Sequence, residues 1–239
     1  MRTFRPAAIA LLLLAVLLPA TALAAAPKPY TARYEVLRNG ERIGEATIRF
    51  AALANGRFDF TSSTRGSGGL AAVLGVSIDE RSILRVHDGR LETVAYSYAQ
   101  KIGWKDKQRS LKVDATGQRI TSTDKGQEIA LPYQAGVLDR HAVSIALMQD
   151  LAAGRQGDLL YTVAERRELG TQRYRTEGTE RVQTPMGTLD AIRVDRLRES
   201  GDGRSTQFWL SARHAFVPVR MLQKEPEGES IEMRIISVN

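Results

Sequence analysis

Three residues near the middle of the chain carry the side chains of a hydrolase triad. Asp139, His141 and Ser144 supply a carboxylate, an imidazole and a hydroxyl within six positions. In such a triad the histidine takes the proton of the serine, and the carboxylate orients the histidine. On a helix, however, residues two apart point to different faces, so Asp139 and His141 cannot easily form that pair. We therefore expect Asp139 to cap the start of a helix.

Two adjacent carboxylates suggest a second kind of hydrolysis. Asp79 and Glu80 lie side by side in a region with strand character, and a pair of acids is the minimal requirement for glycoside cleavage. Neighbours on a strand face opposite ways, however, and the chain has 27 acidic residues. A carboxylate-dependent hydrolase acting on cell-wall or lipid material is therefore the alternative function.

The sequence predicts no metal site and no cofactor. The three histidines, His87, His141 and His214, lack the i, i+4 spacing of a zinc-binding helix, and cysteine is absent. Gly66-Ser67-Gly68-Gly69 lacks both the Gly-x-Ser-x-Gly pattern of a nucleophile elbow and the Lys-Ser/Thr ending of a phosphate loop. We interpret that stretch as a flexible loop.

A few aromatic residues are candidates for binding. Tyr96 and Tyr98 share one face of an expected strand, and Trp104 follows Gly103 shortly after it. Ligand pockets are mostly apolar with a few polar groups, so Tyr96, Tyr98 and Trp104 could line a ligand groove. Packing within the core or across strands is the alternative for the same residues.

Regular turn signals predict a mainly β protein. Asn39-Gly40 separates two runs of strand character, and an Asn-Gly pair favours the type I′ turn of a hairpin. Similar turns along the chain predict ten to twelve strands. Residues 139–153 lack Gly and Pro and carry apolar residues at helical spacing, which predicts one helix ending before Gly154. Residues 69–74 could form a second, short helix.

These elements predict a large, highly curved antiparallel sheet or partly open β-barrel with one helix packed on its concave side. A two-sheet β-sandwich is the alternative fold. No linker divides residues 25–239, so we expect a single domain.

The first residues predict export. Arg2 and Arg5 precede about a dozen apolar residues, too few for the ~20 that cross a bilayer, and an Ala-rich segment follows. We expect a signal peptide over residues 1–24, with cleavage as late as residue 26, and no stable membrane anchor afterwards. Its removal lowers the formal net charge from +7 to +5. The scattered basic residues and the export signal argue against nucleic acid as a partner.

Several marks spread along the chain form a recognisable series. They are Tyr34-Glu35-Val36 with Gly40 and Gly44, the Leu70–Ser82 passage, Leu138-Asp139-Arg140, Leu151-Ala152-Ala153-Gly154, Thr184-Pro185-Met186-Gly187, Trp209-Leu210-Ser211 and Pro218-Val219-Arg220. In this order and spacing the chain resembles the bacterial envelope family DUF3108, a domain of unknown function. The resemblance spans about residues 30–238. It implies an exported, mainly β protein of Gram-negative bacteria, and it supplies no catalytic residues.

Together these features predict a non-enzymatic periplasmic binding or accessory protein of the cell envelope. We expect its curved sheet and helix to enclose an apolar groove for a lipid-like ligand or a segment of an envelope protein. The sequence does not specify the oligomeric state.

Overall fold

One curved sheet forms most of the molecule. The computed structural model describes residues 27–198 and 203–239. In these residues fifteen strands follow the spatial order β8-β7-β6-β5-β4-β3-β2-β1-β15-β14-β13-β12-β11-β10-β9. The strands are β1 (Tyr30–Arg38), β2 (Glu41–Ala52), β3 (Arg57–Gly66), β4 (Ser77–His87), β5 (Arg90–Ile102), β6 (Lys105–Asp114), β7 (Arg119–Asp124), β8 (Gln127–Pro132), β9 (Leu138–Asp139), β10 (Asp158–Glu165), β11 (Glu168–Thr184), β12 (Gly187–Leu197), β13 (Ser205–Ser211), β14 (Val217–Lys224) and β15 (Ser230–Val238).

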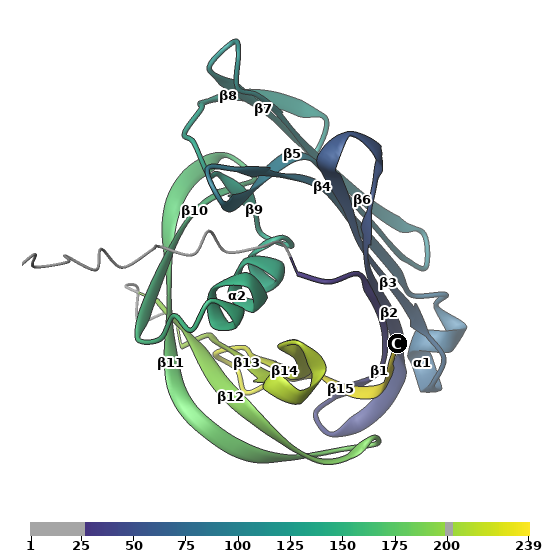
Figure 1. Ribbon diagram of the computed structural model, residues 1–239. Helices are drawn as coiled ribbons and strands as arrows, with labels where there is room; N and C mark the ends of the chain where they lie inside the picture. The colour runs from purple at the N-terminus through teal and green to yellow at the C-terminus, as the bar shows by residue number, and fades with distance from the viewer. Residues whose placement is uncertain (1–26, 199–202) are drawn as a thin grey trace, which may run out of the picture.

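The sheet curls into a ring that does not close (Figure 1). The first and last strands, β1 and β15, pair in its middle, with Ala32 opposite Val238. All pairs are antiparallel except the short β9, which is parallel to β10. The predicted partly open barrel is confirmed. The β-sandwich alternative is wrong, because one continuous sheet contains every described strand.

Turn residues explain the hairpins. Asn39 and Gly40 have φ angles of 52° and 84°, and Asp88 and Gly89 have 49° and 74°. Positive values at both positions are what a type I′ turn requires, which is why Asn-Gly and Asp-Gly pairs form it readily. The expected ten to twelve strands are too few, partly because Lys125-Gly126 makes another such turn between β7 and β8 (φ 53° and 77°).

The principal helix, α2 (Val143–Ala152), lies inside the curve of the sheet (Figure 1). It begins later than the predicted residue 139, because Asp139 belongs to β9 and pairs with Ala164. The Asp139 carboxylate still accepts hydrogen bonds from the backbone N–H groups of His141 and Ala142, at 2.8 and 2.9 Å, in the turn that leads into α2. Gly154 follows the helix with a φ of 75°, the left-handed conformation common at helix ends.

Three shorter helical segments complete the described structure: α1 (Gly69–Val73), as predicted, and the 3₁₀ turns η1 (Ala54–Gly56) and η2 (Ala212–His214). None of the helices in residues 27–198 and 203–239 is long and apolar enough to cross a membrane. The predicted signal peptide, residues 1–24 or up to 26, lies outside the described residues.

The hydrophobic core has two parts. The larger part joins α2 to both halves of the sheet, and the side chains of Ile145, Leu147 and Met148 are fully buried in it. The helix is thus apolar on most of its circumference because strands surround it. The smaller part lies under β5–β8 and includes Tyr96, Tyr98 and Leu111.

The β9–β10 end of the sheet lies against β5 and β7 without forming a strand pair with them. The Thr93 N–H of β5 donates to the carbonyl oxygen of Val137 at 2.9 Å, just before β9. The Ser122 hydroxyl of β7 donates to the carbonyl oxygen of Arg166, in the turn between β10 and β11. These two hydrogen bonds connect the sheet across its opening. We call the region around Thr93, Ser122, Val137 and Arg166 the seam.

Candidate functional site

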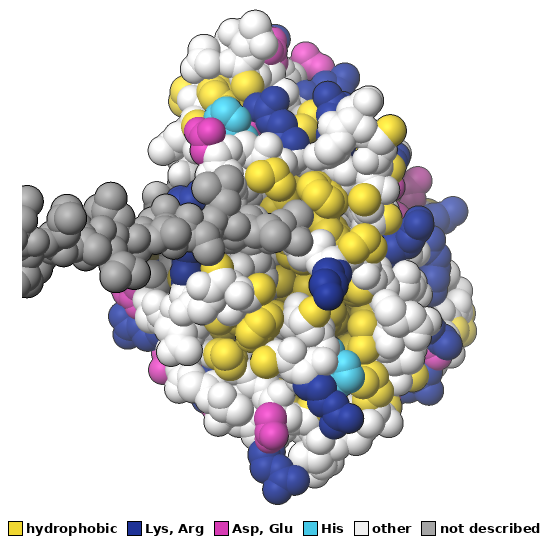
Figure 2. Space-filling view, in the orientation of Figure 1, with side chains coloured by type: hydrophobic (Ala, Val, Ile, Leu, Met, Phe, Trp, Pro, Cys, Tyr) yellow, Lys and Arg dark blue, Asp and Glu magenta, His cyan; other side chains and the backbone are white. Residues whose placement is uncertain are grey.

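A cavity of about 610 Å³ lies beside α2. It is bounded by α2, β10 and the β4–β5 turn, and its apolar lining includes Leu91, Leu138, Ala146, Leu159 and Tyr161. Pockets that bind small molecules typically measure about 300–1,000 Å³ and have mostly apolar walls. Figure 2 shows hydrophobic side chains gathered in the middle of the face seen in Figure 1, with most charged side chains nearer its periphery. The cavity therefore has the size of a ligand site, and its walls combine the apolar residues with charged and polar side chains such as Asp88, Arg90 and Gln149.

Two polar residues of α2 fix the helix on either side of this cavity. The Gln149 side chain accepts a hydrogen bond from Leu91 N–H at 3.3 Å and donates one to the Gly89 carbonyl at 3.2 Å. The Asp150 carboxylate accepts one from the Tyr161 hydroxyl at 2.7 Å. Burial and the nearby Asp150 charge raise the pKa of Tyr161, so the phenol remains a neutral donor. The cavity walls are thus held by specific bonds from the helix to β5 and β10.

The rim of the cavity carries charges of both signs. Arg155 pairs with Asp150 at 2.7 Å, and Asp158 pairs with Arg175 at 2.6 Å. Arg90 is exposed and also lines the cavity. Asp88 also lines the cavity; its side chain is 91% exposed and lies 3.5 Å from His87 Nε2. The rim beside Arg90 therefore offers charges of both signs to a ligand.

Asp139 is the centre of a buried polar cluster at the other end of α2. It is fully buried, and so are Ser82 of β4 and Thr93 of β5. Its carboxylate accepts hydrogen bonds from the Ser82 hydroxyl at 3.0 Å and the Thr93 hydroxyl at 2.9 Å, besides the two backbone N–H groups of the turn. Burial raises the pKa of Asp139 to about 6, although all four hydrogen bonds oppose that change.

The structure does not assemble the triad considered from the sequence. The Ser144 hydroxyl donates to the backbone carbonyl of His141, at 3.1 Å, rather than to its ring. Instead Ser82 lies between the other two members, with its hydroxyl 3.0 Å from His141 Nδ1 and 3.0 Å from Asp139. In a catalytic triad the histidine lies between the acid and the serine, and the serine is accessible. Ser82 is fully buried and lies between Asp139 and His141, so its hydrogen bonds connect β4 to the turn before α2 and serve a structural role.

His141 is kept neutral by its surroundings. Its ring stacks on Phe60 with centroids 4.0 Å apart, and its Nε2 atom is buried without a hydrogen-bond partner in the described structure. Burial lowers the pKa of His141 to about 4, although the Glu80 charge acts in the opposite direction. The lowered pKa keeps the His141 ring uncharged near neutral pH, which suits its stacking on the apolar Phe60 ring.

We predict that His141→Gln makes the protein less sensitive to acid. The unfolded chain takes up a proton at His141 below pH ~6.5, whereas the native state does so only near pH 4. His141 therefore lowers the free energy of unfolding as the pH falls across this window. Asp139, with its raised pKa, acts oppositely between about pH 6 and 4.

Urea unfolding of both proteins at pH 7, 6 and 5 measures this contribution. Relative to its value at pH 7, the variant should gain roughly 1–2 kcal/mol over the natural protein at pH 5. Asp139 is present in both proteins, so its contribution largely cancels in the comparison. Parallel pH profiles would show that His141 does not titrate differently in the folded state.

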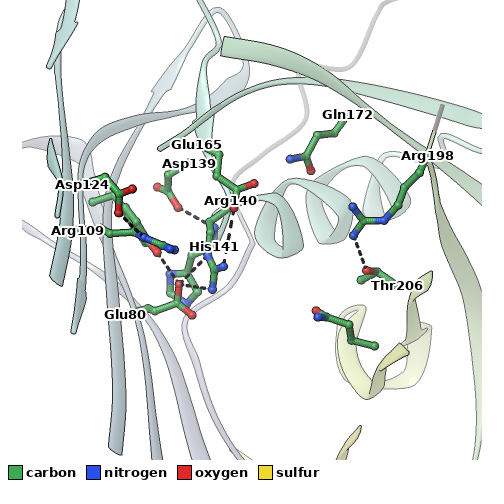
Figure 3. A network of polar contacts seen from close by, with 12 residues as sticks. Glu80, Arg109, Asp124, Asp139, Arg140, His141, Glu165, Gln172, Arg198 and Thr206 are labelled. Carbon is green, nitrogen blue, oxygen red and sulfur yellow. Dashed lines mark hydrogen bonds and ion pairs between the residues drawn. The ribbon is translucent and has the colours of Figure 1, made fainter. Parts of the chain in front are cut away.

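A second polar network bridges the seam (Figure 3). Glu80 of β4 accepts a hydrogen bond from Tyr96 at 2.6 Å and pairs with Arg140 at 3.0 Å. Arg140 also lies 4.0 Å from Glu165 of β10. Burial alone would raise the pKa of Glu80, but His141, Arg140 and the bond from Tyr96 together lower it below its ordinary value. Arg140 thus connects β4 to β10 across the opening.

Asp79 and Glu80 do not form a catalytic pair in this arrangement. The Asp79 side chain is 49% exposed and bonds Ser63 and Arg65 at 2.8 Å each. Glu80 points to the opposite face, where Tyr96 and Arg140 bind it. Two acids that act on one glycosidic bond must flank it from a common site. The alternation of side chains along β4 separates these two.

The three candidate groove residues lie in two different places. Tyr96 and Tyr98 share a face, as expected, but both are buried in the smaller core. Tyr98 lies between two guanidinium groups, those of Arg109 and Arg140, each 5.4 Å from its ring centre. Trp104 is 87% exposed in the β5–β6 turn, where Gly103 takes a φ of 59°. The turn carries Trp104 past the end of the strand, so it does not join the tyrosines, and none of the three lines the 610 Å³ cavity.

The histidines are also dispersed. His87 ends β4 beside the cavity, His141 lies in the buried cluster and His214 ends η2. Among residues 27–198 and 203–239, no group of three or more His, Asp or Glu side chains has the geometry to hold a metal ion.

Asp139 and His141 were candidates from the sequence, whereas their partners Ser82 and Thr93 and the cavity residues were not. Ser82 and Thr93 are ordinary strand residues in the sequence, and their partner Asp139 is 57 and 46 residues away. The cavity residues Leu91 and Leu159 come from distant strands. The one local signal was the broad apolar surface of the helix, which indicated a concave surface around it.

Comparisons with known proteins support the fold. No functionally curated protein matches the chain. A solved β-barrel-like protein of the DUF1849 family from Brucella abortus is 11% identical, with 90% of this chain and 99% of that chain covered and a TM-score of 0.57. This likeness shows the fold alone.

Two further solved structures are more distant. MucB is 10% identical, covering 91% of this chain and 55% of that chain, with a TM-score of 0.33. A putative lipoprotein from Parabacteroides distasonis is 8% identical, covering 91% and 98%, with a TM-score of 0.35. At these scores neither structure supports a functional argument.

The sequence pattern of one protein family accounts for most of the chain. The family described as "Protein of unknown function (DUF3108)" matches residues 29–235. That range includes nearly all of the described strands, both helices and every residue of the cavity and of the seam. The chain therefore belongs to the DUF3108 family, whose function is unknown.

Proposed function

We propose that this protein is a non-enzymatic binding or accessory protein of the bacterial periplasm, which holds a lipid-like ligand in the cavity beside α2. The observation that carries the proposal is the 610 Å³ cavity between α2 and β10. The predicted signal peptide supports the compartment. A segment of an envelope protein with apolar side chains is the second kind of ligand that such a cavity would accept.

The wall chemistry favours an amphipathic molecule. Of the apolar lining, Leu160 is 60% exposed, whereas Leu91, Leu138, Ala146 and Leu159 are 2–6% exposed. Arg90 at the rim offers a positive charge to an acidic head group. Burying a methylene group stabilises a complex by about 0.8 kcal/mol, so a chain of several carbons would supply useful affinity. A long-chain fatty acid has both parts.

A binding role also agrees with the arrangement of the polar groups. Catalysis by nucleophile and base requires an accessible nucleophile next to its base. The Ser82–His141 contact is buried, and the Asp79 and Glu80 carboxylates face opposite sides of β4. The hydrolase alternative therefore gains no support from these residues.

Native mass spectrometry of the mature chain purified from periplasm tests the proposal. The expected result is a population heavier than the bare chain by the mass of a lipid-like molecule, which solvent extraction then releases and identifies. Pull-down from envelope extract tests for the protein-segment ligand. If native spectra show only the bare chain, extraction releases no lipid and the pull-down recovers no partner, the proposal is wrong.

A further inference from the structure

An exposed apolar surface lies far from the cavity. The short helix α1 and the β5–β6 turn form it together, and α1 lies outside the curve of the sheet whereas α2 lies within it (Figure 1). Leu70 is 70% exposed, Val73 82% and Trp104 87%. Single exposed apolar side chains are normal on a protein surface, but a contiguous group indicates an interaction site.

The parts of this surface are joined by a direct contact. The Gly103 N–H donates to the Leu74 carbonyl oxygen at 2.7 Å, which fixes the β5–β6 turn against the end of α1. Leu70, Val73 and Leu74 are three and four residues apart, so they share one side of this helical turn. We call the set Leu70, Val73, Leu74 and Trp104 the apolar tip.

The charges around the apolar tip are mainly positive. Lys101, Lys105 and Lys107 flank Trp104 on the two strands, with one acid, Asp106, directly opposite Lys101. Lys105 and Lys107 share the other face of the hairpin. The segment from Gly66 to Val76, which contains α1, carries no charged side chain at all. The Arg65 charge next to it is neutralised by Asp79 at 2.8 Å. The exposed apolar side chains of the tip thus lie beside a hairpin that carries an excess of lysines, on both of its faces.

We propose that the apolar tip docks reversibly on the surface of an anionic lipid bilayer. Tryptophan favours the boundary between head groups and hydrocarbon, where its ring is apolar and its N–H remains hydrated. Lysines near the surface are attracted to anionic head groups. The uncharged α1 segment beside Trp104 can enter the interface without burying an unpaired charge.

Docking in this way would leave the cavity accessible. β4 begins at Ser77, four residues after the end of α1, and ends ten residues later at His87, which lines the cavity. At about 3.3 Å per residue this strand separates the two sites by roughly 35 Å. The inference rests on the apolar tip alone and does not depend on what the cavity binds.

Vesicle binding tests the docking proposal. The mature chain is sedimented with phosphatidylcholine vesicles, with and without phosphatidylglycerol, while tryptophan emission is recorded. The chain has two tryptophans, and Trp209 is buried and bonded to Glu180, so a blue shift on binding reports Trp104. We expect binding and a blue shift with phosphatidylglycerol vesicles, and both should weaken with added salt.

Substitutions at exposed positions test the location without disturbing the fold. Val73→Glu combined with Trp104→Glu should weaken sedimentation at least about tenfold. Lys101→Gln and Lys105→Gln should each weaken it about fivefold, the equivalent of about 1 kcal/mol per lysine. Leu53→Glu, at a 40% exposed position outside the cavity lining and at the end of β2 away from α1, is the matched control and should bind like the natural chain.

Three results would overturn the docking proposal: no binding to anionic vesicles, binding that the Val73→Glu and Trp104→Glu double variant leaves unchanged, or equal loss of binding in Leu53→Glu. Self-association through Trp104 without vesicle binding would also overturn it and would identify a second copy of the chain as the partner. Failure of lipid extraction in the ligand test leaves these results unaffected, so the two proposals can be judged separately.

Discussion

Replacing Asp139 by alanine is expected to lower the free energy of unfolding by roughly 3–5 kcal/mol, because it leaves several buried donors without an acceptor. The lost acceptor serves the hydroxyls of Ser82 and Thr93 and the backbone N–H groups of His141 and Ala142. All of these lie where β4, β5 and β9 meet the start of α2. Urea unfolding followed by circular dichroism measures the change.

Asp79→Ala is the matched control for this prediction. Asp79 lies on the neighbouring part of β4, also accepts hydrogen bonds from side chains, and is 49% exposed. Water can replace its partners, so we expect a loss of less than about 1 kcal/mol. Equal losses in the two variants would show that the Asp139 cluster does not hold the seam.

The second large effect concerns ligand binding. Ala146 is 5% exposed, lies on α2 and lines the cavity. Ala146→Trp places an indole in the space that we assign to the hydrocarbon chain, so we expect the affinity for a fluorescent long-chain fatty acid to fall at least about tenfold. Titration of the fatty acid, monitored by its fluorescence, gives the dissociation constants of both proteins.

Ala152→Trp is the control for the cavity substitution. It makes the same change on the same helix at an exposed position that does not line the cavity. We expect its affinity to match that of the natural chain. Overpacking by Ala146→Trp can cost about 1–3 kcal/mol of stability, so circular dichroism must first show that both variants are folded. Unchanged affinity in a folded Ala146→Trp protein would contradict binding beside α2.

The hairpins could be predicted from the sequence because their causes are local. Asn39-Gly40 and Asp88-Gly89 select a turn type on their own, and the alternation of residues 43–50 places Ile48 and Phe50 on one buried face. The helix was predicted for a similar reason, from its apolar spacing. Its start was not, because Asp139 is held in β9 by pairing with β10.

The sites could not be predicted because they depend on distant segments. The Ser82 and His141 contact joins residues 59 positions apart, and the cavity joins β5, α2 and β10. Aromatic side chains suggested a groove at Tyr96, Tyr98 and Trp104, but pattern alone does not distinguish a buried tyrosine from a lining one. Trp104 instead lies on the apolar tip, beside α1.

We propose that the cavity beside α2 holds an apolar chain. Photo-crosslinking of a diazirine-labelled long-chain fatty acid to the mature protein, followed by peptide mapping, tests this claim most directly. We predict that labels fall on α2 residues 146–150 and β10 residues 158–162, and that unlabelled fatty acid competes with them. Labels confined to α1 and the β5–β6 turn, or no labels that compete, would contradict it.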